Sequence, residues 1–248
     1  MGGSRTMQEN IDLSVIVPCF NEQDNIPVLV ERIDKAVRLY GIKTEIILVD
    51  DLSKDNTWQV MQETAKKYPT VKCVHHKVNK GIVGGWKTGT EKAQGTYILT
   101  TDADLQYLPE DIPRLYREIV KDDYDLVQGW RHATEDKNFI RWAQSKVFSG
   151  MLNVMFFMHL RDIKSGFIVY KKKVLMDVLN YKSQYKHFQH LITVAAHCKG
   201  YKIKQIPVIF EKRHAGVSYL KNVPIRFILK ALTDLPKAFV EYFLKRGR

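Results

Sequence analysis

Short apolar runs rich in β-branched residues recur along most of the chain, and amphipathic stretches separate them. The first run, residues 13–18, is followed by a stretch from Ile26 to Tyr40 whose apolar residues are spaced by three and four positions. Such runs predict buried strands, and this spacing predicts a helix, which Gly41 should end. The same pattern predicts further strands at residues 45–49, 71–75, 96–99, 125–129, 167–170 and 202–210.

Helices are predicted between these strands. Gly81, Gly84 and Gly85 predict a flexible loop, followed by a helix that reaches Ala93. The alternation of strand and helix predicts an α/β fold with a Rossmann-like, mostly parallel central sheet flanked by helices. The other helices are expected at residues 57–67, from 109 onward, and at 139–160, 187–197 and 223–244.

Two late segments are more apolar than the rest. Residues 151–160 and the amphipathic helix at 223–244, which Pro236 should kink, could each pack in the core or lie on a membrane surface. No run of about 20 apolar residues occurs, so no membrane-spanning helix is expected.

Two carboxylates follow the strand predicted at residues 96–99. In an extended chain, Asp102, Asp104 and Gln106 would point to the same side and could converge on one point. Carboxylate and amide oxygens suit Mg²⁺ or Mn²⁺, held partly hydrated against substrate phosphates. The alternative is a solvated acidic turn, because so short a pattern is a weak signal alone.

More polar residues follow the other early strands. The carboxyl ends of parallel strands meet at one edge, where open α/β sheets bind ligands. Strands disfavour carboxylates, so a cluster offset by a metal and a nucleotide explains them better than a solvated edge. The side chains expected at this edge are Asn21, Glu22, Asp50, Asp51, Asp102 and Asp104.

The composition narrows the class of partner. The chain has 248 residues, enough for one large domain, and 39 basic against 27 acidic residues give a net charge of +12. This surplus favours an anionic partner such as a nucleotide or a phospholipid surface. Nucleic acid is disfavoured, because the basic residues are scattered and carboxylates crowd the expected site. Three distant cysteines predict neither a disulfide framework nor a zinc site, and they fit a reducing, cytoplasmic setting.

Seven groups of motif residues occur along the chain. They are Pro18-Cys-Phe-Asn-Glu22; Val49-Asp-Asp51 with Ser53-x-Asp55-x-Thr57; Asn79-x-Gly81; Asp102-Ala-Asp-Leu-Gln106 with Pro109-Glu110; Gly129-x-Arg131; Asp162-x-x-Ser-Gly-Phe167; and Ile206-Pro-Val-x-Phe210 with Arg213-x-x-Gly216-x-Ser218.

In this order and spacing the chain resembles inverting family 2 glycosyltransferases of the GT-A fold. The closer likeness is to the dolichol-phosphate mannose synthase and polyprenyl-phosphate glycosyltransferase group. The resemblance implies a catalytic domain at residues 7–220, after a cloning remnant at 1–6 and before a basic amphipathic helix at 221–248.

The resemblance implies a donor site for a GDP- or UDP-sugar. Asp51 would accept hydrogen bonds from the base or ribose, and Asp102 would lie near the ribose and metal. Asp104, with Gln106, would hold Mg²⁺ or Mn²⁺ where charge grows on the leaving nucleoside diphosphate. The other residues expected along the donor are Pro18, Phe20, Glu22 and Lys80.

The expected acceptor is a polyprenyl or dolichyl phosphate. The late helix reads His187-Phe-Gln-His190 and offers no acid as a base, whereas a phosphate is already anionic and needs none. It needs cations instead, and the planar fork of arginine suits phosphate. Asp162 would be the base if one were required. The residues expected at the acceptor phosphate are Arg131, Arg141, Ser145, Arg213 and Ser218.

Other interpretations stay open. Transfer to a sugar hydroxyl in polysaccharide or cell-surface glycan synthesis would use Asp162 or Glu135-Asp136 as base. A nicotinamide-binding protein is disfavoured, because no G-x-G-x-x-G motif follows the first strand. An inactive scaffold is a further alternative. A lipid acceptor implies a place on the cytoplasmic face of a membrane, reached directly or through a membrane subunit, since many relatives continue into transmembrane helices.

Overall fold

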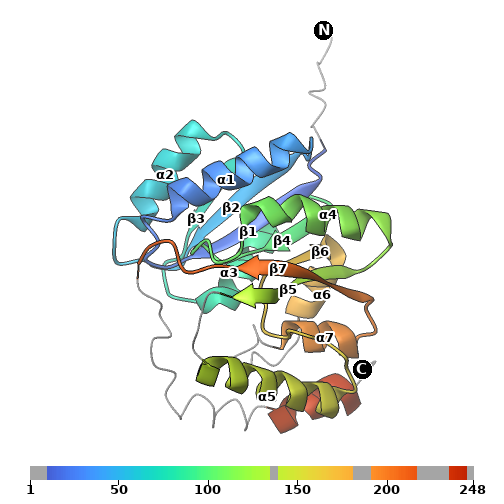
Figure 1. Cartoon of the computed structure of the whole chain (residues 1–248). Helices are drawn as coiled ribbons and strands as arrows, with labels where there is room; N and C mark the ends of the chain where they lie inside the picture. The colour runs from blue at the N-terminus through green and yellow to red at the C-terminus, as the bar shows by residue number, and fades with distance from the viewer. Residues whose placement is uncertain (1–9, 135–138, 181–190, 217–234, 245–248) are drawn as a thin grey trace.

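The structure is a computed structural model that describes residues 10–134, 139–180, 191–216 and 235–244 (Figure 1). Its centre is a seven-stranded sheet with the strand order β3-β2-β1-β4-β6-β5-β7. The predicted strands are confirmed, with ends that differ by at most one residue, except that β5 continues further than expected. The strands are β1 (Leu13–Cys19), β2 (Thr44–Asp50), β3 (Val71–His75), β4 (Tyr97–Thr100), β5 (Leu126–Thr134), β6 (Ile168–Lys171) and β7 (Ile203–Phe210).

The sheet is mostly parallel, as the alternation of strands and helices predicts. β1 pairs in parallel with both β2 and β4, and β5 pairs in parallel with β7. β6 lies between β4 and β5 and is antiparallel to both. The tips of β1, β2, β4 and β5 therefore meet at one edge of the sheet.

Helices cover both faces of the sheet (Figure 1). On one face, Val15 of β1 and Leu48 of β2 share a core with α1, α2 and α4. On the other, Ile16 of β1 and Ile98 of β4 share a core with α3, α5, α6 and α7. The helices are α1 (Ile26–Leu39), α2 (Thr57–Lys67), α3 (Gly81–Lys92), η1 (Pro109–Asp111), α4 (Ile112–Lys121), α5 (Phe139–Phe156), α6 (Lys172–Leu179), α7 (Ile192–Cys198) and η3 (Val240–Leu244).

The loop predicted around Gly84 and Gly85 is wrong, because α3 already begins at Gly81. The glycines serve close packing instead. A Cβ atom on Gly85 would lie 2.8 Å from Cβ of Pro18, and one on Gly89 would lie 2.4 Å from Cγ2 of Ile16. Glycine at these two positions lets α3 approach the β1 backbone.

α5 ends before the predicted boundary at residue 160. The Asn153 side chain both donates to the carbonyl of Leu160 (2.8 Å) and accepts from its N–H (3.0 Å), and Phe157 takes a φ of +54°. Leu152 and Phe156 are buried in the core, whereas Val154 is 78% exposed. One face of residues 151–160 therefore packs in the core, which is one of the two alternatives that the sequence left open, and the other face is exposed.

The described part of the C-terminal segment packs on the body of the protein. Residues 235–239 are helical and continue into η3. Leu235, Ala238 and Tyr242 are buried, and the rings of Phe239 and Phe156 lie 5.7 Å apart. Residues 221–234 of the predicted helix, and residues 187–190 of another, lie outside the described residues. No helix within the described ranges is long and apolar enough to cross a membrane.

Candidate active site

The polar side chains at the carboxyl edge of the sheet form three separate groups. Glu22 and the Asp102–Gln106 turn lie together beyond β1 and β4, joined by Arg213 from the segment after β7. Asp50 and Asp51 end β2 and face the end of β3. Arg131 of β5 pairs with Asp162.

The chain from Asp102 to Gln106 is a turn, so the expectation of an extended segment is wrong. The turn is at Ala103-Asp104, and Leu105 has a φ of +62°. Backbone bonds to the segment after β7 hold it there, because the N–H of His214 donates to the carbonyl of Asp104 (3.1 Å) and that of Glu211 to the carbonyl of Gln106 (2.9 Å). Convergence by simple strand alternation therefore does not apply.

Both carboxylate oxygens of Asp104 accept hydrogen bonds. Oδ1 accepts from the N–H of Gln106 at 3.1 Å, and Oδ2 accepts from Nη1 of Arg213 at 3.2 Å. Burial raises the pKa of Asp104, and the Gln106 N–H and the Arg213 charge offset part of that increase. The Gln106 amide nitrogen donates to the carbonyl of Glu211 at 3.2 Å, which leaves its oxygen as the atom that could face a cation.

Glu22 lies on the other side of Arg213 and accepts from its Nη2. Its second oxygen accepts from Nδ2 of Asn25 at 2.6 Å. Asn25 is buried and also bonds the carbonyl of Ala215, so it ties the start of α1 to the segment after β7. Burial raises the pKa of Glu22, and the hydrogen bonds from Asn25 and Arg213 oppose that shift without cancelling it.

Asp102 lacks the hydrogen-bond donors that its neighbours have, since no described residue donates to its carboxylate. Burial, followed by the charges of Asp104 and Glu22, raises the pKa of Asp102 to about 7. Two close carboxylates that repel each other favour a bound cation. No group of three His, Cys, Asp or Glu side chains placed for metal binding occurs in the described ranges. The hard oxygens of Asp102 and Asp104 fit Mg²⁺ or Mn²⁺ completed by substrate oxygens and water.

Asp51 is a separate, fully bonded carboxylate. Its oxygens accept from the N–H groups of Lys80 and Gly81, both at 2.7 Å, and from Nδ1 of His76 at 2.8 Å. These bonds fix the first turn of α3 to β2. Asp50 similarly pairs with Nδ1 of His75 at 2.7 Å.

Arg131 and Asp162 form a two-point ion pair. Nε lies 2.7 Å from Oδ2 and Nη2 lies 2.9 Å from Oδ1. The N–H groups of Arg131 and Lys164 also donate to this carboxylate. Burial favours a neutral Asp162, but the bonds from Arg131 outweigh it and lower its pKa. A carboxylate so occupied is suited to holding Arg131 and poorly suited to removing a proton.

The structure describes three of the remaining expected residues and leaves the side chains of the others outside its described part. Pro18 packs against Gly85, and Phe20 lies just beyond β1. The Lys80 side chain is exposed, and its N–H begins α3. The other expected side chains lie outside the described ones: Arg141, Ser145, Ser218, Glu135 and Asp136.

Sequence reasoning missed three residues of the site. The position of Asn25 just before α1 could have indicated its role. His76 directly follows β3, the strand that pairs with β2, and this position could have indicated that it lies near Asp51. Lys164 lies inside the Asp162-x-x-Ser-Gly motif and stands 5.3 Å from the Phe148 ring. Its N–H donates to Asp162 at 3.2 Å, and burial, followed by the charge of Arg131, lowers the pKa of the Lys164 side chain.

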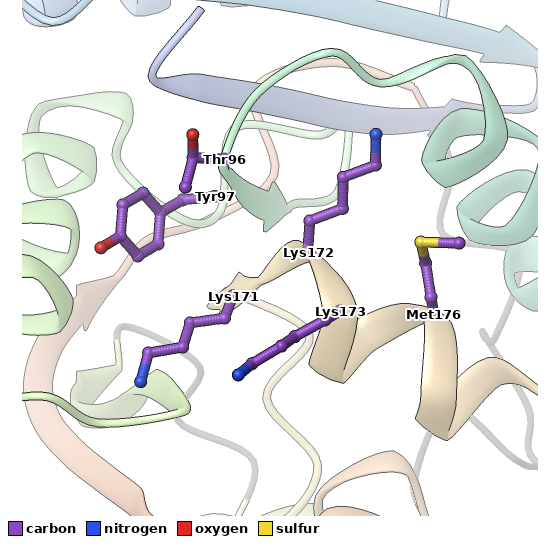
Figure 2. A pocket seen from close by; sticks show the side chains of 6 residues that line it. All are labelled: Thr96, Tyr97, Lys171, Lys172, Lys173 and Met176. Atoms are coloured by element: carbon purple, nitrogen blue, oxygen red, sulfur yellow. The ribbon is translucent and has the colours of Figure 1, made fainter.

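A hollow of about 450 Å³ opens at the opposite edge of the sheet, at the start of β4 (Figure 2). It is lined by Thr96, Tyr97, Met176 and three lysines. Lys171 pairs with Asp123 at 2.7 Å, and Lys172 donates to the carbonyl of Ala93 at 2.6 Å. Two of the three lysines thus already have hydrogen-bond partners. The hollow lies at the edge of the sheet opposite to Asp102 and Asp104.

The family model "Glycosyl transferase family 2" matches residues 14–179, which include most of β1, the Asp102–Gln106 turn and the Arg131–Asp162 pair. The chain belongs to this family. It is 34% identical over 232 residues to a dolichol-phosphate mannosyltransferase of Pyrococcus furiosus, covering 91% of this chain and 64% of that protein. It is 29% identical over 251 residues to a dodecaprenyl-phosphate galacturonate synthase of Rhizobium johnstonii, covering 99% of this chain and 72% of that protein.

Solved glycosyltransferase structures share the fold. A mannosyltransferase from Pyrobaculum calidifontis in complex with GDP-Man and Mn²⁺ superposes with a TM-score of 0.59 and 17% identity, over 94% of this chain and 63% of that one. Glucosyl-3-phosphoglycerate synthase from Mycobacterium tuberculosis, in complex with Mn²⁺, UDP-glucose and phosphoglyceric acid, superposes with a TM-score of 0.64 and 15% identity. This match covers 90% of this chain and 79% of that one. The expected family and GT-A fold are confirmed.

Proposed function

We propose that this glycosyltransferase domain moves a sugar from a nucleotide-sugar to the phosphate of a polyprenyl lipid. The names of both curated relatives refer to prenyl-phosphate products or acceptors, which supports this acceptor class. The chain spans 64% of the length of the Pyrococcus relative, so the transfer is proposed for the domain described here.

The observation that carries the proposal is the Arg131–Asp162 pair. Its guanidinium is held by two hydrogen bonds to the carboxylate, which also accepts from the N–H of Lys164. The carboxylate that a hydroxyl acceptor would use as base is occupied by four donors. An acceptor phosphate brings its own negative oxygen, and a preformed cation positions it.

We expect the acceptor oxygen to attack the anomeric carbon on the face opposite the leaving diphosphate. The bond from that carbon to the diphosphate breaks as the new bond forms, so the configuration inverts. No proton has to leave the acceptor. Arg131 would hold the phosphate in line, with Asp162 fixing the direction of its side chain.

On the donor side, Asp102, Asp104 and Gln106 would hold Mg²⁺ or Mn²⁺. The metal, when bound, would neutralise the diphosphate as it leaves. Pro18, Phe20, Glu22, Asp51 and Lys80 are proposed along the nucleotide. Asp51 would act mainly through the turn it builds, because its oxygens already accept three hydrogen bonds.

A lipid acceptor requires contact with a membrane surface, and α5 supports a peripheral position there. Val147 and Val154 of α5, and Phe157 just after its end, are 70–78% exposed. Exposed apolar side chains on a basic protein suit an anionic membrane. A catalytic domain at 7–220, followed by a membrane-associating segment at 221–248, remains part of the proposal.

The donor half is tested by calorimetry. GDP, UDP and their sugar conjugates are titrated with and without Mn²⁺ into the wild type and Asp104→Ala. We expect metal-dependent binding of one nucleotide, lost in Asp104→Ala and kept in Glu31→Gln, which removes an exposed carboxylate on α1. Folded wild-type protein that binds no nucleotide would refute the proposal.

A further inference from the structure

Arg213 links the expected metal ligand to the start of α1. Its Nη1 donates to Asp104, its Nη2 to Glu22, and its Nε to the carbonyl of Ala215 at 2.8 Å. The Arg213 side chain is 19% exposed, and the Glu22 and Asp104 side chains are each 12% exposed. The guanidinium is therefore held on three sides in a largely dry position.

The balance of charge explains why Arg213 is held there. Glu22, Asp102 and Asp104 lie close enough that each of the other two raises the pKa of Asp102. Arg131 is nearby but is engaged by Asp162. Arg213 is thus the cation that contacts this carboxylate cluster among the described residues, and the cluster carries more negative than positive charge.

A metal ion at Asp104 would compete with Arg213. Oδ1 of Asp104 accepts from the Gln106 N–H, and Oδ2 faces Nη1 of Arg213. A cation that binds Oδ2 would take the place of the Nη1 contact, which at 3.2 Å is longer than the Nε contact. With the Nε and Nη2 contacts kept, the planar guanidinium stays in place, and Nη1 loses its acceptor and becomes free to donate to another anion.

We propose that Arg213 occupies the cation position of Asp104 in the metal-free protein, and that metal binding frees its Nη1 arm for the acceptor phosphate. The inference rests on the proposed function, because it assigns the released arm to that acceptor. The guanidinium carbon of Arg131 lies 5.2 Å from the centre of the Phe210 ring, and Phe210 precedes Arg213 by three residues, so the two arginines lie at the same end of the sheet. A phosphate beside Arg131 is therefore within the neighbourhood of the released arm. The consequence is ordered binding, with the metal-loaded donor before the acceptor.

The first test uses metal-free protein in chelator and citronellyl phosphate, a short water-soluble prenyl phosphate, as the probe. Asp104→Asn mimics the metal by removing the partner of Nη1, and we expect it to tighten probe binding at least tenfold in calorimetry. Asp102→Asn is the matched control at pH 8, above the Asp102 pKa of about 7, because there it removes a negative charge from the same turn without touching Arg213. We expect less than a threefold change for this control. Equal tightening in both variants would show a net-charge effect alone and overturn the proposal.

A double variant separates Arg213 from the rest of the site. Asp104→Asn combined with Arg213→Gln should return probe affinity to the wild-type level. Arg213→Gln alone should not tighten probe binding, because it removes the cation and leaves Glu22 and Asp104 unpaired. Persistence of the tight binding in the double variant would contradict the proposal.

The second test adds Mg²⁺ with GDP or UDP to the wild type. The proposal predicts at least tenfold tighter probe binding in the presence of the nucleotide that binds, and no such gain in Arg213→Gln. Nucleotide binding without this gain overturns the ordered release while the proposed function stands. Absence of nucleotide binding overturns the proposed function, and the metal-free test still decides whether Asp104 holds Arg213.

Discussion

Asp162 accepts two hydrogen bonds from the Arg131 guanidinium, with nitrogen–oxygen distances of 2.7 and 2.9 Å. The pair joins the tip of β5 to the loop before β6, and it turns a conformationally free side chain into a fixed fork. Arginine in this arrangement loses less conformational entropy when it binds an anion. The pair therefore connects local packing to the choice of acceptor.

Replacement of Asp162 by Asn should weaken acceptor binding more than turnover. We expect KM for a prenyl phosphate to rise by about 10–100-fold, because Arg131 loses its fixed direction, and stability to fall by about 2–4 kcal/mol from the broken, mostly buried pair. Steady-state kinetics and denaturant unfolding measure the two effects. A fall in kcat of about 10²–10⁴ with unchanged KM would instead identify Asp162 as a general base.

Asp102 should destabilise the metal-free protein at neutral and alkaline pH. Its pKa is raised to about 7 in the folded state by burial and by two neighbouring carboxylates. The folded state therefore binds a proton more tightly than the unfolded state, and this group's contribution becomes less favourable as pH rises toward and through 7. In chelator at pH 8, Asp102→Asn should gain about 1–2 kcal/mol, or roughly 2–6 °C in Tm.

The pH dependence separates this charge effect from general packing. The advantage of Asp102→Asn should shrink between pH 8 and pH 6, as the wild-type carboxylate takes up its proton. Added Mn²⁺ should raise the Tm of the wild type and leave that of the variant unchanged. If the variant is less stable than the wild type throughout this range, the ionised Asp102 carboxylate does not destabilise the folded protein.

Gly89 should tolerate no side chain, because α3 lies against β1 at this point. An added Cβ would lie 2.4 Å from Cγ2 of Ile16. We expect Gly89→Ala to lose about 1–3 kcal/mol from overpacking, despite its better helix propensity. Gly150→Ala is the control, since nothing lies within 4 Å of its Cβ position, and it should gain about 0.5–1 kcal/mol. Equal Tm shifts for both variants would contradict the close packing.

Asp51 should stabilise the protein through the first turn of α3. Asp51→Ala leaves the N–H groups of Lys80 and Gly81 and the ring of His76 without their acceptor. We expect a loss of about 2–5 kcal/mol and faster hydrogen exchange confined first to residues 80–83. Asp24→Ala, at an exposed site in a nearby turn, should change neither quantity. Unchanged exchange at residues 80 and 81 would show that these bonds do not hold the turn.

Much of the fold could be predicted from the sequence, because buried parallel strands leave unmistakable apolar runs. β1 and β3 were located to within a residue, and the edge that gathers Asp51 and Asp102 follows from parallel pairing. The start of α3 was missed because glycine signals a loop when read locally. At Gly85 and Gly89 its role is close contact with β1, which only the tertiary structure reveals.

The site was predictable in its residue types and less so in its partners. The sequence could indicate carboxylates beyond β1, β2 and β4, but not that Asp51 and Asp104 belong to separate groups. That division depends on Arg213 and His76, which arrive from distant segments. The bend at Leu105 was missed because it depends on backbone bonds with residues 211–214.

The most direct measurement compares acceptors in one assay. The whole chain, with Mn²⁺ and the sugar nucleotide identified by calorimetry, is offered equal amounts of a polyprenyl phosphate and the matching polyprenol. Radiolabelled sugar on each lipid is then quantified. The account predicts transfer to the phosphate alone, with at least tenfold less product from Arg131→Lys because the two-point fork is lost. Comparable transfer to the polyprenol would contradict the account and favour a hydroxyl acceptor.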